Sequence, residues 1–296
     1  MPQLSCPIVL FTYNRLENTK KVVESLLNNH CVKEANLFIF SDGPKNESAL
    51  IKVNLVREFL KTIKGFKSVE IIEAENNLGL ANSIISGVTH VLKNHNSVIV
   101  LEDDLIVSQN FLKYMNEALN YYVQKKQVIS IAGYRPPFHI ENSYKYDTFF
   151  ARRNTSWGWA TWRDRWELIE WNIIRDKDVL GSPKKKYGFF KLGANLLPMY
   201  HKQKRGLIDS WAIRFSLNQY KLKMYTVFPV KNKVLNIGFG ADATHTAINS
   251  GFNNNLDTTG GTDFHFPNVI KETQVISRQF YREYSLYKKI KNILKK

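Results

Sequence analysis

Cysteine is almost absent from this sequence, which has only Cys6 and Cys31 among its 296 residues. Two thiols are too few for the disulfide framework of a small secreted domain, so we expect a reducing compartment in which each thiol is buried as a small apolar side chain. Apolar runs long enough to cross a membrane are missing, as is the charged and then apolar N-terminal pattern of a signal peptide. These absences predict a cytoplasmic protein.

Acidic residues are scarce relative to basic ones, with 26 Asp and Glu against 42 Lys and Arg and a net charge of +16. Such an excess attracts nucleic acids, anionic membranes or phosphorylated substrates. The sequence has no zinc-finger spacing, no RNP motif and no evident helix-turn-helix. We therefore expect no nucleic-acid partner.

Much of the positive charge lies in the C-terminal segment, where residues 278–296 contain seven basic residues and a single acid, Glu283. Apolar side chains recur there at steps of three and four residues, which predicts a basic amphipathic helix within residues 266–296. These apolar residues are Phe280, Tyr284, Tyr287, Ile290 and Leu294. Two interpretations stay open: the helix contacts the anionic inner face of the plasma membrane, or it docks on the domain with its basic face in water.

Glycine-rich phosphate loops are also missing, because neither a Gly-x-Gly-x-x-Gly motif nor a Walker lysine loop occurs. A diphosphate would instead have to be neutralised by a basic side chain such as Arg15 together with a metal ion held by acids. Suitable acids follow the apolar run at residues 98–101, which is typical of a strand buried on both faces of a parallel sheet. That strand ends in Glu102, Asp103 and Asp104.

Three adjacent carboxylates repel one another, and a hard divalent cation with oxygen ligands would relieve the repulsion. On an extended chain, side chains alternate between the two faces, so we expect Glu102 and Asp104 on one side and Asp103 on the other. The alternative interpretation of the acidic triplet is a solvated turn.

The first 135 residues alternate between strands and helices, with strands expected at residues 6–13, 37–40, 69–72 and 97–101. This alternation predicts a parallel sheet, and ligands of such sheets bind at the carboxyl ends of the strands. The rule gathers the polar residues that follow each strand at one rim. They are Asn14 and Arg15, Asp42 and Gly43, Asn77 and Gly79, and the acidic triplet. Asp42 could accept hydrogen bonds from a nucleobase or could stabilise a turn before Gly43 and Pro44.

The second half, residues 136–265, is richer in aromatic and basic residues. The spacing of Trp159, Trp162 and Trp166 is typical of one helical face, which could form a sugar platform or core. We assign Trp162 and Trp166 to packing and Trp157 to the wall of a pocket. Gly158 indicates a close backbone approach, which we expect to be to a sugar.

Two further segments of the second half concern the acceptor. Residues 181–205 are basic and are interpreted either as a mobile loop plus a helix beside the acceptor or as a solvated surface. Asp209 is expected to open a helix, where the helix dipole favours a carboxylate, so on its own it could be merely a cap. Residues 249–262 are expected to form a long loop.

The ordered set of motifs resembles the GT-A fold, nucleotide-sugar-dependent glycosyltransferases, in particular bacterial family 2-like enzymes. The acidic triplet in its Glu-Asp-Asp form more closely resembles the N-acetylglucosaminyltransferase I group. The resemblance covers residues 7–245. It is carried by Tyr13-Asn14-Arg15, Ser41-Asp42-Gly43, Asn77-Leu78-Gly79-Leu80-Ala81-Asn82, Glu102-Asp103-Asp104, Ser156-Trp157-Gly158-Trp159 and Asp209-Ser210-Trp211.

The resemblance implies an α/β GT-A domain with a Rossmann-like, mostly parallel sheet flanked by helices. Residues 1–135 would form its nucleotide-sugar half, residues 136–265 its acceptor half, and residues 266–296 the C-terminal helix. Arg15 and Asp42 would hold the nucleotide, with Asp42 at the uracil, and Asp103 would contact the ribose or the donor sugar. The other expected donor contacts are Thr12, Asn14, Asn77, Gly79, Asn82, Glu102, Trp157 and Gly158.

The resemblance also implies the chemistry. Asp104 would be the direct ligand of a Mn²⁺ or Mg²⁺ ion that bridges the diphosphate, and Asp209 falls where that group keeps its catalytic base. Some GT-A enzymes take a second metal ligand from a histidine in the region of His245, although a lone histidine can equally be an ordinary loop residue.

The sequence therefore predicts an inverting glycosyltransferase of bacterial surface polysaccharide synthesis. We expect UDP-GlcNAc or another UDP-hexose as the donor and a glycan or a polyprenyl-diphosphate-linked glycan as the acceptor. One alternative is a sugar nucleotidyltransferase, whose usual glycine-rich and basic loop is lacking after the first strand. The other is a non-catalytic protein that binds polysaccharide or membrane.

Overall fold

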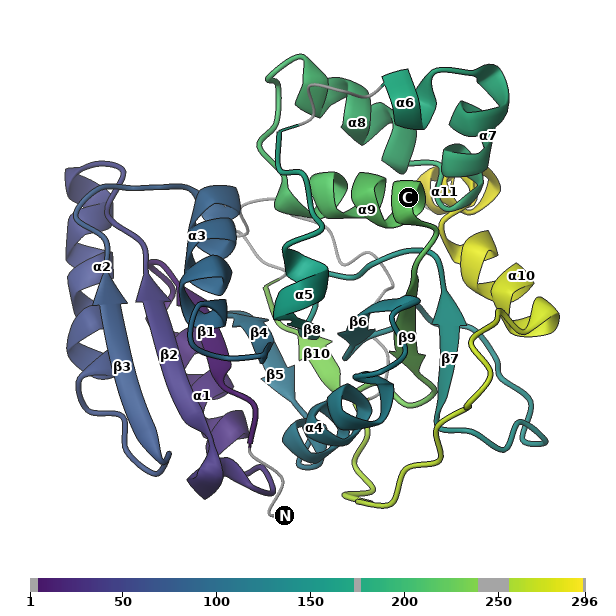
Figure 1. Ribbon diagram of the computed structural model, residues 1–296. Helices are drawn as coiled ribbons and strands as arrows, with labels where there is room; N and C mark the ends of the chain where they lie inside the picture. Colours follow the sequence, from purple (N-terminus) through teal and green to yellow (C-terminus); the bar gives the residue numbers. More distant parts are fainter. Residues whose placement is uncertain (1–4, 173–176, 239–255, 295–296) are drawn as a thin grey trace.

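The computed structural model describes residues 5–172, 177–238 and 256–294 (Figure 1). Its core is an eight-stranded sheet with the strand order β3-β2-β1-β4-β8-β6-β9-β7. The first four strands in this order are parallel and come from the N-terminal half. They are β1 (Ile8–Thr12), β2 (Asn36–Ser41), β3 (Ser68–Glu73) and β4 (Ser97–Glu102). The strands predicted from apolar runs are thus confirmed.

The same sheet continues through β6 (Val128–Ala132), which still belongs to the first 135 residues. It then includes three strands of the second half, β7 (Thr148–Ala151), β8 (Trp159–Trp162) and β9 (Tyr225–Pro229). Only β8 and β7 run against the other strands of this sheet. The predicted α/β fold with a mostly parallel sheet is therefore confirmed. A second, two-stranded sheet pairs β5 (Leu105–Val107) with β10 (Val234–Asn236) in antiparallel fashion, and no local pattern predicts this pairing.

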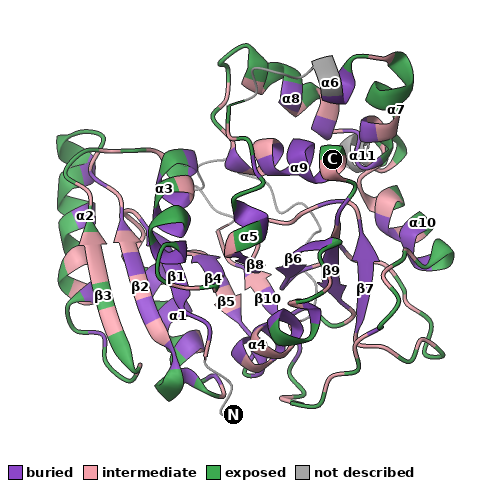
Figure 2. Ribbon diagram, viewed as in Figure 1, coloured by how far each residue is buried: buried purple, intermediate pink, exposed green. Residues whose placement is uncertain are grey.

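Helices cover both faces of the large sheet because side chains of each strand alternate between the faces. Ile8 and Leu10 of β1 pack into one core with α1 and α4, whereas Val9 and Phe11 pack into a second core with α3 and α9. Figure 2 shows the central strands buried and the outer side of α2 exposed. The helices on the sheet are α1 (Leu16–Leu27), α2 (Glu47–Leu60), α3 (Leu80–Leu92), α4 (Phe111–Tyr122), α5 (Arg163–Trp166) and α9 (Trp211–Leu222).

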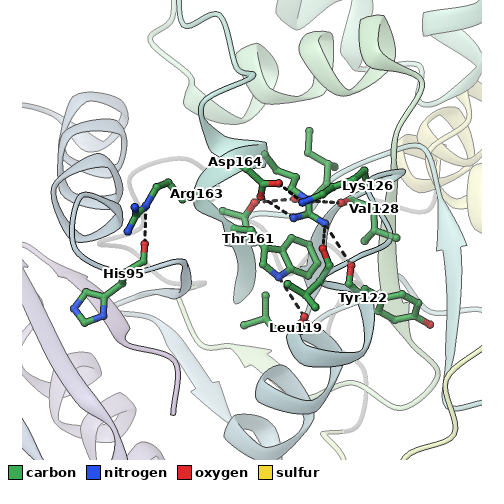
Figure 3. A network of polar contacts seen from close by, with 12 residues as sticks. His95, Leu119, Tyr122, Lys126, Val128, Thr161, Arg163 and Asp164 are labelled. Carbon is green, nitrogen blue, oxygen red and sulfur yellow. Dashed lines mark hydrogen bonds and ion pairs between the residues drawn. The ribbon is translucent and has the colours of Figure 1, made fainter. Parts of the chain in front are cut away.

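A polar network around α5 ties the two halves of the sheet together (Figure 3). Arg165 is only 2% exposed. It donates to the main-chain oxygen of Val123 at 2.6 Å and pairs with Asp164 at 2.7 Å. Arg163 donates to the main-chain oxygen of His95, just before β4, at 3.1 Å. A cation at the end of α4 is favoured by the helix dipole, so Arg165 both fills the core and caps α4.

The tryptophan residues do not form one helical face, and that prediction is wrong. Trp159 and Trp162 lie in β8, and only Trp166 lies in a helix, α5. Trp159 stacks on Trp166 with ring centroids 5.8 Å apart, while Trp162 packs into the core on the other face. A spacing of three and four residues arose here from a strand followed directly by a helix. The packing roles of Trp162 and Trp166 are confirmed, because each is only 3% exposed.

The basic stretch at residues 181–205 is helical, so the predicted mobile loop is wrong. It contains α7 (Pro183–Lys191) and α8 (Leu196–Lys204), which follow α6 (Lys177–Leu180). Phe189 of α7 and Tyr200 of α8 bury against α9 in a separate apolar cluster. We refer to α6, α7, α8 and α9 as the upper helical layer, as Figure 1 shows it above the sheet.

The C-terminal segment forms two helices instead of the single one predicted. The first, α10 (Gln274–Glu283), docks on the sheet with Phe280 fully buried, and the second, α11 (Leu286–Leu294), follows after Tyr284 and Ser285. Among the cysteines, Cys6 is buried as predicted, but Cys31 is exposed, so its predicted burial is wrong. In the described residues, every helix is too short or too polar to cross a membrane.

A buried ion pair fastens the chain after residue 255 to the sheet. Lys233 and Asp257 form a contact between side chains that are 5% and 2% exposed, and Asp257 also accepts from Asn110 at 3.1 Å and from the Thr259 hydroxyl at 2.6 Å. Burial favours a raised pKa for Asp257, but the hydrogen bonds from Lys233, Thr259 and Asn110 outweigh it and lower the pKa. Burial also lowers the pKa of Lys233, although Asp257 opposes this shift. The cost of burying the two charges therefore offsets part of the stabilisation that the ion pair contributes.

Lys233→Met is expected to lower the free energy of unfolding by about 3 kcal/mol, because it leaves the Asp257 carboxylate buried and without its cation. Because the pKa of Asp257 is lowered, its contribution is present above its ordinary pKa of 3.8 and is lost progressively as the pH falls from that value through the lower pKa of the folded state. Urea unfolding should therefore show a difference from the unsubstituted protein that is larger at pH 7 than at about pH 3, where only part of the contribution has been lost. An equal difference at both pH values would contradict this role of the pair.

Candidate functional site

Arg15 holds two of the three predicted acids at the carboxyl ends of β1 and β4. Its guanidinium pairs with the Asp103 carboxylate, and its Nη1 lies 3.1 Å from Oδ2 of Asp104. The backbone N–H of Tyr13 donates to Oδ2 of Asp103 at 3.2 Å. Asp103 and Asp104 therefore both face Arg15, and the predicted placement on opposite sides is wrong. The chain turns between β4 and β5, so the alternation of an extended strand stops at Glu102.

The three acids are electrostatically destabilised where they stand. Burial raises the pKa of Asp103 to about 6, although Arg15 opposes the shift. Burial also raises the pKa of Asp104 against the same opposition, and burial together with its two acidic neighbours raises the pKa of Glu102 well above its usual range. For Arg15, burial lowers the pKa, but the two aspartates outweigh it and raise the pKa. One guanidinium thus faces three carboxyl groups, which favours a further cation.

The residues present suit a divalent ion that shares its ligands with a substrate. Among the described residues, no group of three His, Cys, Asp and Glu side chains comes together as a complete metal site. Mg²⁺ is commonly bound by one or two carboxylates plus substrate phosphates, so an incomplete set is what such a site needs. Asp104 would supply the carboxylate oxygens from the protein. His245, the other predicted ligand, lies outside the described residues.

The small sheet brings a glycine against Asp104. The N–H of Ile237, just after β10, donates to the main-chain oxygen of Asp104 at 2.8 Å. A Cβ atom on Gly238 would lie 2.2 Å from Oδ2 of Asp104, so a larger residue there would require the carboxylate or the backbone beside it to shift. Gly238 was not predicted as a site residue, because the pairing of β5 with β10 joins segments more than 100 residues apart.

Asp42 is held by four donors of the protein itself. Its Oδ1 accepts from the N–H groups of Gly43 at 2.9 Å and Leu78 at 2.8 Å. Its Oδ2 accepts from Nδ2 of Asn77 at 3.0 Å and from the N–H of Gly79 at 3.1 Å. A carboxylate has about four acceptor positions, so these bonds use its capacity. Asp42 thereby joins the end of β2 to the start of α3, and its contact with a uracil stays a prediction.

The remaining residues predicted on the donor side lie near the same strand ends. Thr12 is buried, and its hydroxyl has no hydrogen-bond partner within the described segments. Asn14 is half-buried beside Arg15, and Asn82 is exposed, with its Nδ2 donating to the main-chain oxygen of Leu78 at 3.0 Å. Gly79 has φ of +75°, a conformation that favours glycine at this helix start. Their contacts with a nucleotide stay predictions.

Trp157 and Gly158 lie where β8 begins, beside the end of β4. Trp157 is half-buried and its ring centroid lies 4.4 Å from that of Tyr134. Gly158 has φ of +61°, and a Cβ atom there would lie 2.6 Å from Cγ2 of Val234. The close approach predicted at Gly158 therefore exists, and Val234 of β10 makes it. A contact of either residue with a sugar stays a prediction.

Asp209 precedes α9 but does not cap it, so that interpretation is wrong. The cap is Ser210, whose hydroxyl accepts from the N–H of Ile213 at 3.4 Å. The carboxylate of Asp209 is 50% exposed and pairs with Arg214. The start of α9 is fixed to the sheet because Trp211 stacks on Trp159, with centroids 4.8 Å apart. Trp159 pairs with Val100 of β4, two residues before Glu102, so the sheet rim and the start of α9 are joined.

Comparisons with known proteins bear on this arrangement. The model of glycosyl transferase family 2 matches residues 8–184, more than half of the chain. A search of curated proteins found no match. The solved structures include TarS 1–349 of S. aureus in complex with UDP-GlcNAc, which is 11% identical, with 77% of this chain and 57% of that chain covered and a TM-score of 0.42.

Another similar structure is the mannosyltransferase PcManGT from Pyrobaculum calidifontis in complex with GDP-Man and Mn²⁺, which is 11% identical, with 56% of this chain and 45% of that chain covered and a TM-score of 0.39. The matched regions thus span about half the length of these proteins. The family match alone places the chain, and it covers β1 to β8 with Arg15, Asp42 and the acidic triplet, whereas Asp209 and Gly238 lie beyond it. This chain belongs to glycosyltransferase family 2.

Proposed function

We propose that the chain transfers a sugar from a UDP-sugar to a hydroxyl of a glycan or a polyprenyl-diphosphate-linked glycan, with inversion at the anomeric carbon, in bacterial surface polysaccharide synthesis. The observation that carries the proposal is the cluster of Arg15, Asp103 and Asp104 at the carboxyl ends of β1 and β4. Family membership supplies the reaction class. The likeness of the acidic triplet to the N-acetylglucosaminyltransferase I group makes UDP-GlcNAc the first donor to test.

The proposed roles of the residues are those that the resemblance to GT-A glycosyltransferases implies. Asp104 would hold Mn²⁺ or Mg²⁺, and Asp103 and Arg15 would contact the donor. When bound, the metal ion supplies positive charge that stabilises the departing diphosphate. Asp209 would accept the proton of the acceptor hydroxyl while that oxygen attacks the anomeric carbon, which is typically worth ~10²–10⁴-fold in rate. In this scheme residues 1–135 bind the donor and residues 136–265 the acceptor.

A panel of nucleotide-sugars screened for hydrolysis tests the proposal without an acceptor. We expect one UDP-sugar to release UDP in the presence of Mn²⁺, and chelation to stop the release. Release of pyrophosphate from a nucleoside triphosphate and a sugar phosphate would instead identify a sugar nucleotidyltransferase. If no nucleotide-sugar were hydrolysed and calorimetry with UDP and Mn²⁺ gave no heat, the chain would be a non-catalytic binding protein and the proposal would fail.

Gly238→Ala is expected to weaken Mn²⁺-dependent binding of UDP by about tenfold, because the added methyl group must displace the Asp104 carboxylate or the chain beside it. Titration calorimetry measures the change. Gly261→Ala is a matched control, since a Cβ atom there would meet its nearest neighbour, the Thr259 hydroxyl, at an ordinary 3.8 Å. Equal UDP binding by Gly238→Ala and the control would show that Asp104 does not depend on this approach.

A further inference from the structure

One side of the upper helical layer combines basic side chains with apolar side chains that have no cover. Residues 183–207 contain seven Lys and Arg and no Asp or Glu. The N–H of Ala194, in the loop between α7 and α8, donates to the main-chain oxygen of Tyr284 at 2.9 Å, which joins this basic stretch to the end of α10, two residues before α11 begins. Arg153 strengthens the joint, since it lies 3.8 Å over the Tyr284 ring and donates to the main-chain oxygen of Leu192.

The two C-terminal helices divide the apolar stripe of the sequence between them. Phe280 of α10 is fully buried in the core, so the docking interpretation holds for α10. On α11 the stripe stays in water, with Leu286 exposed to 52%, Tyr287 to 59% and Ile290 to 48%. Tyr187 of α7 is exposed to 59% as well. Folding therefore leaves α11 with an apolar side that the described residues do not cover.

The balance of charges distinguishes this surface from another group of exposed apolar side chains, on α2. On α2, Leu50, Ile51 and Leu55 are exposed, but the acids and bases of this helix are equal in number, with Glu47 and Glu58 against Lys52 and Arg57. Around α7 and α11 basic residues dominate. We define the basic apolar surface by its exposed residues Lys184, Lys186, Tyr187, Lys191, Leu286, Tyr287, Ile290 and Lys291.

We propose that the basic apolar surface lies on an anionic lipid bilayer. Aromatic and aliphatic side chains that insert at the level of the headgroups, flanked by lysines that attract anionic lipid, are the features of a helix that binds in the interface plane. The contact with a bilayer does not depend on the proposed function, and only its consequence for the acceptor rests on that function. Because α9 carries Asp209 at its start and packs under α7 and α8, this contact would bring the site to acceptors anchored in the bilayer.

Flotation of the full chain with lipid vesicles tests the proposal. We expect binding to vesicles of phosphatidylcholine mixed with phosphatidylglycerol and no binding to phosphatidylcholine alone, with the binding weakened at high salt because salt screens the lysines. Lys184→Gln combined with Lys186→Gln should weaken binding by about tenfold or more. Leu286→Ser, Tyr287→Ser and Ile290→Ser together should reduce it by at least about tenfold, since the apolar contact is lost.

Matched substitutions on α2 provide the control. Leu50→Ser, Ile51→Ser and Leu55→Ser remove three exposed apolar side chains where the charges are mixed, and this variant should bind vesicles as the unsubstituted protein does. Retention on immobilised heparin should persist in the α11 serine variant, because its lysines remain. Vesicle binding unaffected by the α11 serines would show mere attraction to polyanions and would overturn the proposal, as would an equal loss in the α2 control.

The outcome is separable from the proposed function. Hydrolysis of a soluble UDP-sugar needs no bilayer, so the α11 serine variant should retain it, which also shows that the variant is folded. Vesicle binding without any hydrolysis by the unsubstituted protein would leave the surface intact and refute the glycosyl-transfer proposal. Hydrolysis without vesicle binding would refute the surface alone.

Discussion

Asp104→Asn is expected to lower the rate of sugar transfer by about a thousandfold or more and to remove the dependence of UDP binding on Mn²⁺. The amide keeps the shape of the side chain but removes the charge that would hold the metal ion. Arg15 would then keep a single charged partner, Asp103, which it already contacts. The guanidinium should stay in place, so the loss is one of charge and not of local structure.

Stability measurements distinguish a functional role of Asp104 from a structural one. Burial raises the pKa of this carboxyl, so its charged form is disfavoured where it stands, and Asp104→Asn should leave the thermal midpoint unchanged or raise it. Asp263→Asn, on an exposed segment, is the control and should change neither transfer nor metal dependence. Mn²⁺-dependent heat of UDP binding that survives in Asp104→Asn would exclude Asp104 as the metal ligand.

The parts of the fold that follow from local pattern were predictable, and those that depend on distant contacts were not. The apolar runs of β1 and β4 are buried throughout and that of β2 is buried at Leu37 and Ile39, so their composition identified these strands. The turn at Asp103 depends on Arg15 and on β10, which lie about 90 and 130 residues away in the chain. No local pattern could therefore place Asp103 and Asp104 on the same side.

Asp42 shows the same limit at the site. Its position after β2 was predictable, because polar residues at strand ends converge in a parallel sheet. Donors of Asn77, Leu78 and Gly79 occupy the acceptor positions of its carboxylate. This depends on how closely the two loops approach each other. A Cβ atom on Gly43 would lie 2.4 Å from the backbone carbon of Asn76, so this approach requires glycine. In hindsight, the Asp-Gly pair was the signal of a close contact between loops.

The prediction for the C-terminal segment was wrong for a different reason. A continuous apolar stripe predicted one helix, but periodicity cannot tell which residues find a partner surface. Phe280 and Tyr284 find one, and the helix ends where Tyr284 meets the loop after α7. Tyr287 and Ile290 belong to the same stripe and remain exposed. The docking interpretation thus holds for the first half of the stripe, and contact with a membrane stays a proposal for the second half.

Asp209→Asn is expected to slow transfer to an acceptor by ~10²–10⁴-fold while leaving UDP and Mn²⁺ binding unchanged. The amide cannot take the proton of the acceptor hydroxyl, and Asp209 lies just before α9 and not among the strand ends that would hold the donor. Little stability should be lost, because Asp209 is half exposed and its pairing with Arg214 is screened by water. Separate measurements of transfer and of UDP affinity reveal this split.

Substitutions of Arg214 and Asp164 test whether Asp209 acts as a base or only holds Arg214 in place. If the carboxylate served only to hold Arg214, then Arg214→Met would slow transfer as much as Asp209→Asn does. A base would survive the loss of its neighbour, so we expect less than about a tenfold effect from Arg214→Met. Asp164→Asn tests the same chemical change in an aspartate that is 48% exposed and paired with Arg165, and transfer should be unaffected. A normal rate in Asp209→Asn would remove the base assignment, because the only proton acceptor of the substituted side chain is a weakly basic amide oxygen.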